Sequence, residues 1–396
     1  TVPTVGAGTV NTEFEILTGM RQHDFGVSEY PYKTVLKSKT SESICTDLKK
    51  LGYSTHAVHN NEATFYGRNT VFSNIGFDTF CSMEYMNGLT DSPNGWSNDD
   101  VLSREIMKTL DSTSGPDFTM AITVQSHGKY DGIALDDPTI KVTGAPEGKE
   151  QAYEYYVNEI HEVDRMIDTL IKELSNRKEE TVLVLYGDHL PSLDIQKDDL
   201  SNANLYQTQY VVWDNMNLKK KTKNLHAYQL YAEVLDRIQI HEGMITKYHQ
   251  QTKHRSKLYL TGLTTLSYDL LYGDNYAYDG ENPFKQTELQ MGTEPVKLTS
   301  VQKTKSGYRV VGSGFTPYCK VYYDGTLVES EWISSECLQL QDEFELDEAD
   351  KKDSGEPETE VTEPRDVPNA FVVEVQSDDG VVLSSTQAYP ASQVKK

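Results

Sequence analysis

The stretch Tyr186-Gly187-Asp188-His189-Leu190-Pro191 decides how the chain is interpreted, together with the apolar run at residues 181–185 that precedes it. The run is short, rich in β-branched residues and without alternation, which predicts a strand buried on both faces of a parallel sheet. Open α/β sheets bind ligands outside the carboxyl ends of their strands. Asp188 and His189 carry ordinary ligand atoms for a divalent metal. On its own, the Gly187-Asp188-His189 triplet is weak evidence for a metal site, because an Asp after a Gly at a strand end usually belongs to a turn.

Two more predicted strands end in histidine. Residues 53–58 lead to His59, and residues 118–124 lead to His127. The chain has ten His, so three at strand ends are more than chance predicts. Helices are expected beside these strands at residues 41–51, where Ser41 is the candidate cap, and at residues 97–110. The clearest predicted helix lies at residues 150–174, because its apolar residues keep a helical spacing. Further along, a strand is expected at residues 206–213 and a helix at residues 225–240. The alternation predicts an α/β fold with a doubly wound, mostly parallel sheet sandwiched by helices.

Thr9 lies in a small-residue loop that runs into another predicted helix, with Asn11 or Thr12 as its cap. Thr9 would then stand just before a helix N-terminus, where backbone N–H groups can hold an anion. Local sequence alone favours the alternative, an ordinary Thr in a glycine-rich turn. The first residues look like the inside of a domain, so we expect a fragment of a longer protein with membrane segments upstream.

The composition excludes some classes of function. The chain has 396 residues and a net charge of −24, which argues against non-specific nucleic-acid binding, and we interpret the charge as serving solubility alone. The four cysteines match no zinc pattern. Cys319 and Cys337 are near enough in sequence to pair, but we expect reduced thiols. No apolar run is long enough to span a membrane.

The pattern changes near residue 293, where short strands with turn signals begin, including a hairpin at Asp324-Gly325. We expect a domain at residues 1–290 and an all-β sandwich module at residues 293–392. Within the module, residues 342–366 are acidic and poor in apolar residues, which predicts a long loop or a disordered insert.

Four ordered motifs carry a resemblance to a known family. They are Gly8-Thr9-Val10-Asn11-Thr12-Glu13-Phe14, then the stretch from His59 to Arg68 (HNNEATFYGR), then Ser126-His127, then Gly187-Asp188-His189-Leu190-Pro191. Together they resemble the extracellular catalytic domain of lipoteichoic acid synthases, phosphoglycerol transferases of the sulfatase and alkaline phosphatase superfamily. The resemblance covers about residues 1–285. The β module outside it looks like an immunoglobulin-like accessory domain.

The resemblance implies a role for each matching residue. Thr9 matches the nucleophile, and Asp188 and His189 match metal ligands that the Thr9 oxygen would complement. His59, Arg68 and His127 match positions that hold the phosphoglycerol group. Asn61 and Tyr66 stand by the same head-group site, where the family can carry an acid and a Trp. The implied cofactor is Mn²⁺ or Mg²⁺, and the family's further acidic ligand would lie upstream of Thr1.

The resemblance implies transfer of phosphoglycerol from a phosphatidylglycerol-type lipid to a cell-envelope polymer, through a covalent threonine intermediate. His127 or His59 would donate a proton to the leaving oxygen. Two alternatives remain. One is a phosphodiesterase or sulfuric ester hydrolase of the superfamily, although no Cys-x-Pro-x-Arg sulfatase motif occurs. The other is an inactive cell-surface binding protein. The expected location is the outer face of the membrane. The expected partners are a lipid head group, or else a phosphate or sulfate ester, and an envelope glycopolymer.

Overall fold

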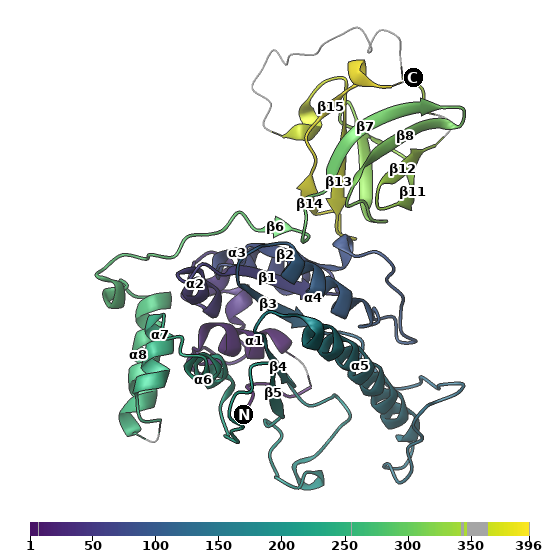
Figure 1. Ribbon diagram of the computed structural model, residues 1–396. Coiled ribbons are helices and arrows are strands. Elements are labelled where there is room, and N and C mark those ends of the chain that lie inside the picture. The colour runs from purple at the N-terminus through teal and green to yellow at the C-terminus, as the bar shows by residue number, and fades with distance from the viewer. Residues whose placement is uncertain (7, 255, 342–343, 347–362, 396) are drawn as a thin grey trace.

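The computed structural model describes residues 1–6, 8–254, 256–341, 344–346 and 363–395 (Figure 1). An α/β part comes first, and a β part follows from about residue 293. The helices run α1 Thr9–Thr18, α2 Ile44–Lys49, α3 Arg68–Asn74, α4 Val101–Asp111, α5 Glu150–Asn176, α6 Leu230–Arg237, α7 Met244–Gln251 and α8 Lys257–Leu271. Among the described residues, no helix is both long enough and apolar enough to cross a bilayer.

The main sheet has the strand order β3-β1-β2-β6, and every neighbouring pair is parallel. Its strands are β1 Ser54–His59, β2 Thr79–Cys81, β3 Asp117–Ile122 and β6 Gln290–Met291. Successive β1 residues face opposite ways: Ala57 packs in a cluster with α1, α2 and α3, and Val58 packs in another with α4 and α5. Helices thus cover both faces of the sheet, which confirms the predicted doubly wound α/β class.

The strand before Asp188 differs from its prediction. β4 (Val182–Tyr186) pairs antiparallel with β5 (Tyr210–Asp214) in a separate two-stranded sheet, and its residues are half-buried. The prediction of a fully buried strand in the parallel sheet is therefore wrong. Val184 packs towards α6, whereas Leu183 packs towards α4 and α5. Because both faces are covered, the run lacks alternation, but that pattern does not specify the direction of the partner strand.

Several element boundaries also shift. α1 begins at Thr9 rather than after an Asn11 or Thr12 cap. Ser43, not Ser41, caps α2, through a capping box with Thr46. The predicted helix at residues 225–240 is shorter, because a 3-10 turn at residues 227–229 precedes α6.

The C-terminal part contains two antiparallel sheets. One has the order β10-β9-β13-β14 with β15 also on β13, and the other has the order β11-β12-β8-β7. Their strands are β7 Lys297–Thr304, β8 Gly307–Ser313, β9 Cys319–Tyr323, β10 Thr326–Val328, β11 Ser330–Ser334, β12 Cys337–Leu340, β13 Ala370–Gln376, β14 Val382–Ser385 and β15 Tyr389–Pro390. A shared apolar core that includes Val310, Val321 and Phe371 joins the sheets, as the predicted all-β module requires.

Two further expectations concern this module. Tyr323 pairs with Thr326 around Asp324-Gly325, which confirms the predicted hairpin. Most of the acidic insert, residues 342–343 and 347–362, lies outside the described residues. The domain limits remain a prediction. All four cysteines are free thiols.

Candidate active site

Thr9 is the first residue of α1. Gly8 before it has a left-handed backbone, with φ 92° and ψ 37°. A side chain at position 8 would also stand 3.1 Å from Thr4 Cγ2, so glycine suits this position on both counts. The hydroxyl-bearing residue therefore sits at the positive end of a helix dipole, where negative charge is stabilised.

The turn after β4 is fastened to the chain on both sides of Thr9. The Gly6 N–H donates to the Leu190 carbonyl at 3.1 Å, and the Thr12 hydroxyl donates to the Asp188 carbonyl at 2.9 Å. These two bonds bracket the helix start. The structure thus brings the predicted nucleophile and the predicted metal-binding turn together.

Asp188 and His189 are arranged like ligands of one cation. His189 Nδ1 donates to the Leu190 carbonyl at 2.8 Å, and Nε2 faces Asp188, 3.3 Å from its Oδ2. A protonated ring makes this contact an ion pair, and the same nitrogen and oxygen atoms are ordinary ligands of a divalent metal. The donor set therefore fits a divalent metal.

The set is small. Among the described residues, no group of three or more His, Cys, Asp or Glu side chains is placed to hold a metal ion. The Asp188 carboxylate and the His189 ring are the two candidate ligands at this turn.

His59 and His127 come from neighbouring strands of the main sheet. β1 and β3 are parallel and pair His59 with Ile122, so both strands end at the same edge. His59 is buried and its Nδ1 donates to the Ile122 carbonyl at 2.9 Å. Burial, followed by the charges of Arg68 and His127, lowers the pKa of His59 well below its usual value. His59 is therefore neutral, and its Nε2 accepts hydrogen bonds.

His127 is exposed, in contrast to His59. Its Nδ1 donates to the Gly128 carbonyl at 2.7 Å. The ring stands edge-on to Trp96, with centroids 4.9 Å apart, and Trp96 Nε1 donates to the same Gly128 carbonyl at 2.9 Å. Trp96 is a supporting residue that the sequence did not reveal, because it lies in an irregular loop far from any motif.

Arg68 is fully buried and paired, which the sequence did not predict. Its Nη2 and Nε bond to the two carboxylate oxygens of Glu13 at 2.5 and 3.2 Å, and Nη1 donates to the Phe65 carbonyl at 3.4 Å. Burial alone would lower the pKa of Arg68, but the Glu13 carboxylate outweighs it and the pKa is raised. The guanidinium thus joins α3 to α1, four residues beyond Thr9, and its charge is largely balanced.

Tyr66 and Asn61 lie on the loop between His59 and Arg68. Tyr66 has a left-handed backbone, with φ 60°, which is uncommon for a bulky residue. Its ring stacks on Tyr30 at 6.3 Å and lies 5.4 Å from the Arg68 guanidinium carbon. The half-buried Asn61 is fixed by its carbonyl, which accepts from the Met83 N–H at 3.2 Å.

Asp99 connects the two histidine-bearing strand ends. Its Oδ1 accepts from the Val124 N–H at 2.9 Å beyond β3 and from the Asn60 side chain at 2.8 Å beyond β1. Burial raises the pKa of Asp99 to about 6. The sequence placed Asp99 only at a helix start. An acid whose hydrogen bonds go to two other segments of the chain leaves no recognisable pattern in its own local sequence.

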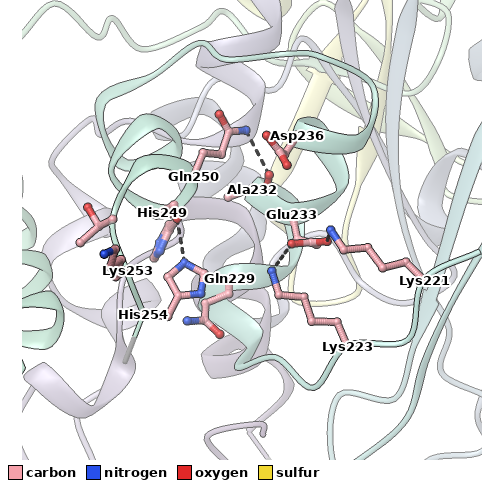
Figure 2. A pocket seen from close by; sticks show the side chains of 11 residues that line it. Lys221, Lys223, Gln229, Ala232, Glu233, Asp236, His249, Gln250, Lys253 and His254 are labelled. Atoms are coloured by element: carbon pink, nitrogen blue, oxygen red, sulfur yellow. Dashed lines mark hydrogen bonds and ion pairs between the residues drawn. The ribbon is translucent and has the colours of Figure 1, made fainter. Parts of the chain in front are cut away.

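A cavity of about 440 Å³ lies elsewhere, between α6, α7 and the loop that carries Lys221 and Lys223 (Figure 2). His249 on its wall donates from Nε2 to the Gly19 carbonyl and accepts at Nδ1 from Tyr259, and burial lowers its pKa to about 4. This histidine is neutral and fully bonded. None of the predicted site residues lines this cavity.

Similarity to known proteins identifies the family of this chain. The family model described as Sulfatase matches residues 2–240. The chain belongs to the sulfatase family. A Rhizobium meliloti (strain 1021) protein named for cyclic beta-1,2-glucan modification is 31% identical over 237 residues, which are 55% of this chain and 36% of that protein. Lipoteichoic acid synthase 2 of Bacillus subtilis (strain 168) is 24% identical over 199 residues, which are 49% of this chain and 30% of that protein.

This sulfatase-family chain spans about a third of the length of these curated relatives. Two solved structures share its fold. The Streptococcus pyogenes phosphoglycerol transferase GacH, in complex with sn-glycerol-1-phosphate, matches with a TM-score of 0.58 and 19% identity, over 72% of this chain and 79% of that one. The Listeria monocytogenes lipoteichoic acid synthase LtaP matches with a TM-score of 0.50 and 20% identity, over 62% of this chain and 65% of that one. Membership of the sulfatase family and the predicted fold class are thereby confirmed.

Proposed function

We propose that this sulfatase-family chain transfers a phosphoglycerol group from a phosphatidylglycerol-type lipid to a hydroxyl of a cell-envelope glycopolymer, at the outer face of the membrane. The observation that carries the proposal is the pair of hydrogen bonds from Gly6 and Thr12 to residues 188–190, on either side of Thr9. It supports a hydroxyl and two metal ligands acting on one phosphate. The lipoteichoic acid synthase relatives and the fold shared with GacH favour the same chemistry.

In the first step, the Thr9 hydroxyl loses its proton to solvent, from which it takes one back on release, and Oγ1 forms a bond to phosphorus while the bond from phosphorus to the diacylglycerol oxygen breaks. The leaving oxygen takes a proton, and His127 is the better donor because it is exposed, whereas burial keeps His59 neutral. In the second step, the acceptor hydroxyl attacks the phosphothreonine, loses its proton to His127 and releases Thr9. The α1 dipole stabilises negative charge at Thr9 throughout.

Asp188, His189 and Thr9 would hold Mn²⁺ or Mg²⁺. Such an ion lowers the pKa of a hydroxyl and offsets phosphate charge. His59 Nε2 is left to accept a hydrogen bond from a glycerol hydroxyl, and Tyr66, with Asn61 beside it, forms the wall of the head-group site.

The test uses an intact protein that contains this chain. Thr9→Ala should abolish release of diacylglycerol from phosphatidylglycerol and remove any phosphoglycerol adduct seen by mass spectrometry of the tryptic peptides. Thr12→Val, which removes only the bond to Asp188, serves as the partial-loss control. Turnover that survives in Thr9→Ala would remove the proposed nucleophile. Free glycerol phosphate as the sole product, with a glycan acceptor present, would favour the hydrolase alternative.

A further inference from the structure

The outward face of α8 is unlike the rest of this charged protein. Among its described side chains the exposed positions are uncharged, and they are Leu258, Leu260, Thr261, Thr265, Tyr268 and, at the C-cap, Tyr272. Leu258 is 76% exposed and Tyr268 is 63% exposed. Asp269 turns inward to accept from the backbone N–H groups of residues 276 and 277. Figure 1 shows α8 as the outermost helix at its edge of the molecule, beyond α7 and α6.

A loop continues this surface towards the active site. Phe25 packs on Tyr272 with ring centroids 6.2 Å apart, and Thr264 of α8 donates to Asp24 at 2.9 Å. Val27 at the tip of the loop is fully exposed. The loop's other acid, Glu29, is occupied by the Gly26 N–H and by Thr34. We call Leu258, Leu260, Tyr268, Tyr272 and Val27 the α8 face.

The α8 face reaches the loop that carries the head-group residues. Tyr30, at the end of the Val27 loop, stacks on Tyr66, and Phe65 next to Tyr66 is 41% exposed. Lys33 Nζ stands 5.1 Å from the Tyr66 ring centroid. Apolar groups therefore extend from α8 to the edge of the candidate active site, and a cation stands beside the last of them.

The charge around the face complements an anionic surface. Residues 219–257 contain nine Lys and Arg but only three acids, although the whole chain carries −24. Lys253, just before α8, is exposed and has no ion-pair partner among the described residues. Leucine with tyrosine, flanked by lysine, is the composition of surfaces that rest in a lipid head-group layer.

We propose that the α8 face binds the surface of a phospholipid bilayer, inserting Leu258, Val27 and Tyr268 among the lipid head groups. The inference rests on the proposed function for its substrate, because a lipid phosphodiester must reach Thr9 from a membrane. Docking on this face brings Phe65 and Tyr66 to the same surface. The lipid head group then enters the site without leaving the membrane.

Vesicle flotation tests the proposal with the full chain and needs no turnover. The probes are phosphatidylcholine vesicles and mixed phosphatidylcholine–phosphatidylglycerol vesicles. The double variant Leu258→Glu/Tyr268→Glu should lower vesicle binding by about ten-fold or more, because each exposed side chain that enters lipid contributes apolar transfer energy. Val27→Glu is a second, independent variant. The matched control Leu327→Glu/Ile333→Glu changes two exposed residues of the β module and should bind like the wild type.

Turnover of a short-chain, water-soluble phosphodiester should stay unchanged in both α8-face variants, whereas turnover of vesicle phosphatidylglycerol should fall with binding. Equal vesicle binding by the wild type and the α8-face variants would overturn the proposal. A lipid-free dimer that the double variant converts to monomer would also overturn it, because a second copy would then cover the face. Face-dependent binding without turnover of either substrate would uphold this inference and overturn the proposed function.

Discussion

The Glu13–Arg68 pair shows how one residue beside the site depends on another. Both side chains are 1% exposed, and each would be an isolated buried charge without its partner. Glu13→Gln should lower the free energy of unfolding by about 3–5 kcal/mol, because it leaves Arg68 charged and uncompensated. Urea denaturation measures the loss.

Two matched variants sharpen this prediction. Glu162→Gln removes the acid of an exposed pair with Arg165 on α5 and should change stability little. The double variant Glu13→Leu/Arg68→Met should cost less than the sum of its single changes, since no charge stays behind. Equal losses of unfolding free energy in Glu13→Gln and Glu162→Gln would show that the buried pair contributes no more to stability than an exposed pair.

The residues in and around the candidate site show what the sequence can predict at this scale. Asp188, His189, His59 and His127 stand where strands end, so local pattern and an ordered set of motifs found them. Glu13 and Asp99 act on segments distant in sequence, and an acid inside a helix or at its start is ordinarily solvated. Only tertiary contacts distinguish such an acid from a surface residue.

At the scale of elements, the start of α1 carries a second prediction. Gly8→Ala places a Cβ in the left-handed region at φ 92° and against Thr4, which should cost about 1–2 kcal/mol and displace Thr9. Gly52→Ala is the matched control, because Gly52 has φ 83° with open space around it, in the turn before β1. Both variants should lose stability in thermal denaturation. Only Gly8→Ala should also lose turnover, and similar turnover in the two would contradict a geometric role for Gly8.

The junction of α2 with α7 carries a pH-dependent prediction. Asp47 in α2 is buried and accepts from Thr246 of α7 at 2.7 Å, and buried Glu42 accepts from the Ile245 N–H at 2.7 Å. Burial, followed by the Glu42 charge, raises the pKa of Asp47 to about 8. The folded chain therefore binds this proton more tightly than the unfolded chain, whose Asp pKa is about 3.9.

The sign of the effect follows from that difference. The stability from protonated Asp47 is complete below a pH of about 4 and is lost as the pH rises through about 8. Urea denaturation should show unfolding free energy falling between about pH 5 and pH 9, and Asp47→Asn should flatten that slope. Asp168→Asn, at an exposed pair on α5, should leave the slope intact. A slope unchanged in Asp47→Asn would contradict the assignment.

The sequence predicted the positions of helices and strands better than it predicted which strands pair. The sequence located β1, β3, α4 and α5 within a few residues, and α5 most clearly, because its apolar residues keep a helical spacing. The antiparallel β4–β5 sheet was not predicted, since two covered faces produce the same apolar run for either strand direction. α3 and α7 were also missed, being short and dependent on the contacts of their ends.

At the scale of the whole molecule, the segment with Glu84 and Tyr85 links the β module to the catalytic part. The Tyr85 hydroxyl bonds to Ser384 Oγ at 2.7 Å, and its ring packs against both the α/β core and the core of the β module. The neighbouring Glu84 carbonyl accepts from the Thr316 hydroxyl at 2.6 Å, and the Glu84 carboxylate accepts from the Ala63 N–H at 3.1 Å. The module is thereby linked to the loop that carries Asn61 and Tyr66.

This linkage predicts that the two parts unfold together. Calorimetry of the full chain should give one cooperative transition, and Tyr85→Ala should split it in two, because the ring that both cores share is lost. Tyr85→Phe keeps the ring and loses one hydrogen bond, so it should lower stability by about 0.5–1.5 kcal/mol without a split. Tyr206→Ala, at a half-exposed ring in the catalytic part, is the control and should leave one transition. Two transitions in the wild type would mean that the Tyr85 contacts do not couple the module to the site. One transition in Tyr85→Ala would assign the coupling to the remaining contacts, such as Thr316 with Glu84 and Asn87 with Phe315.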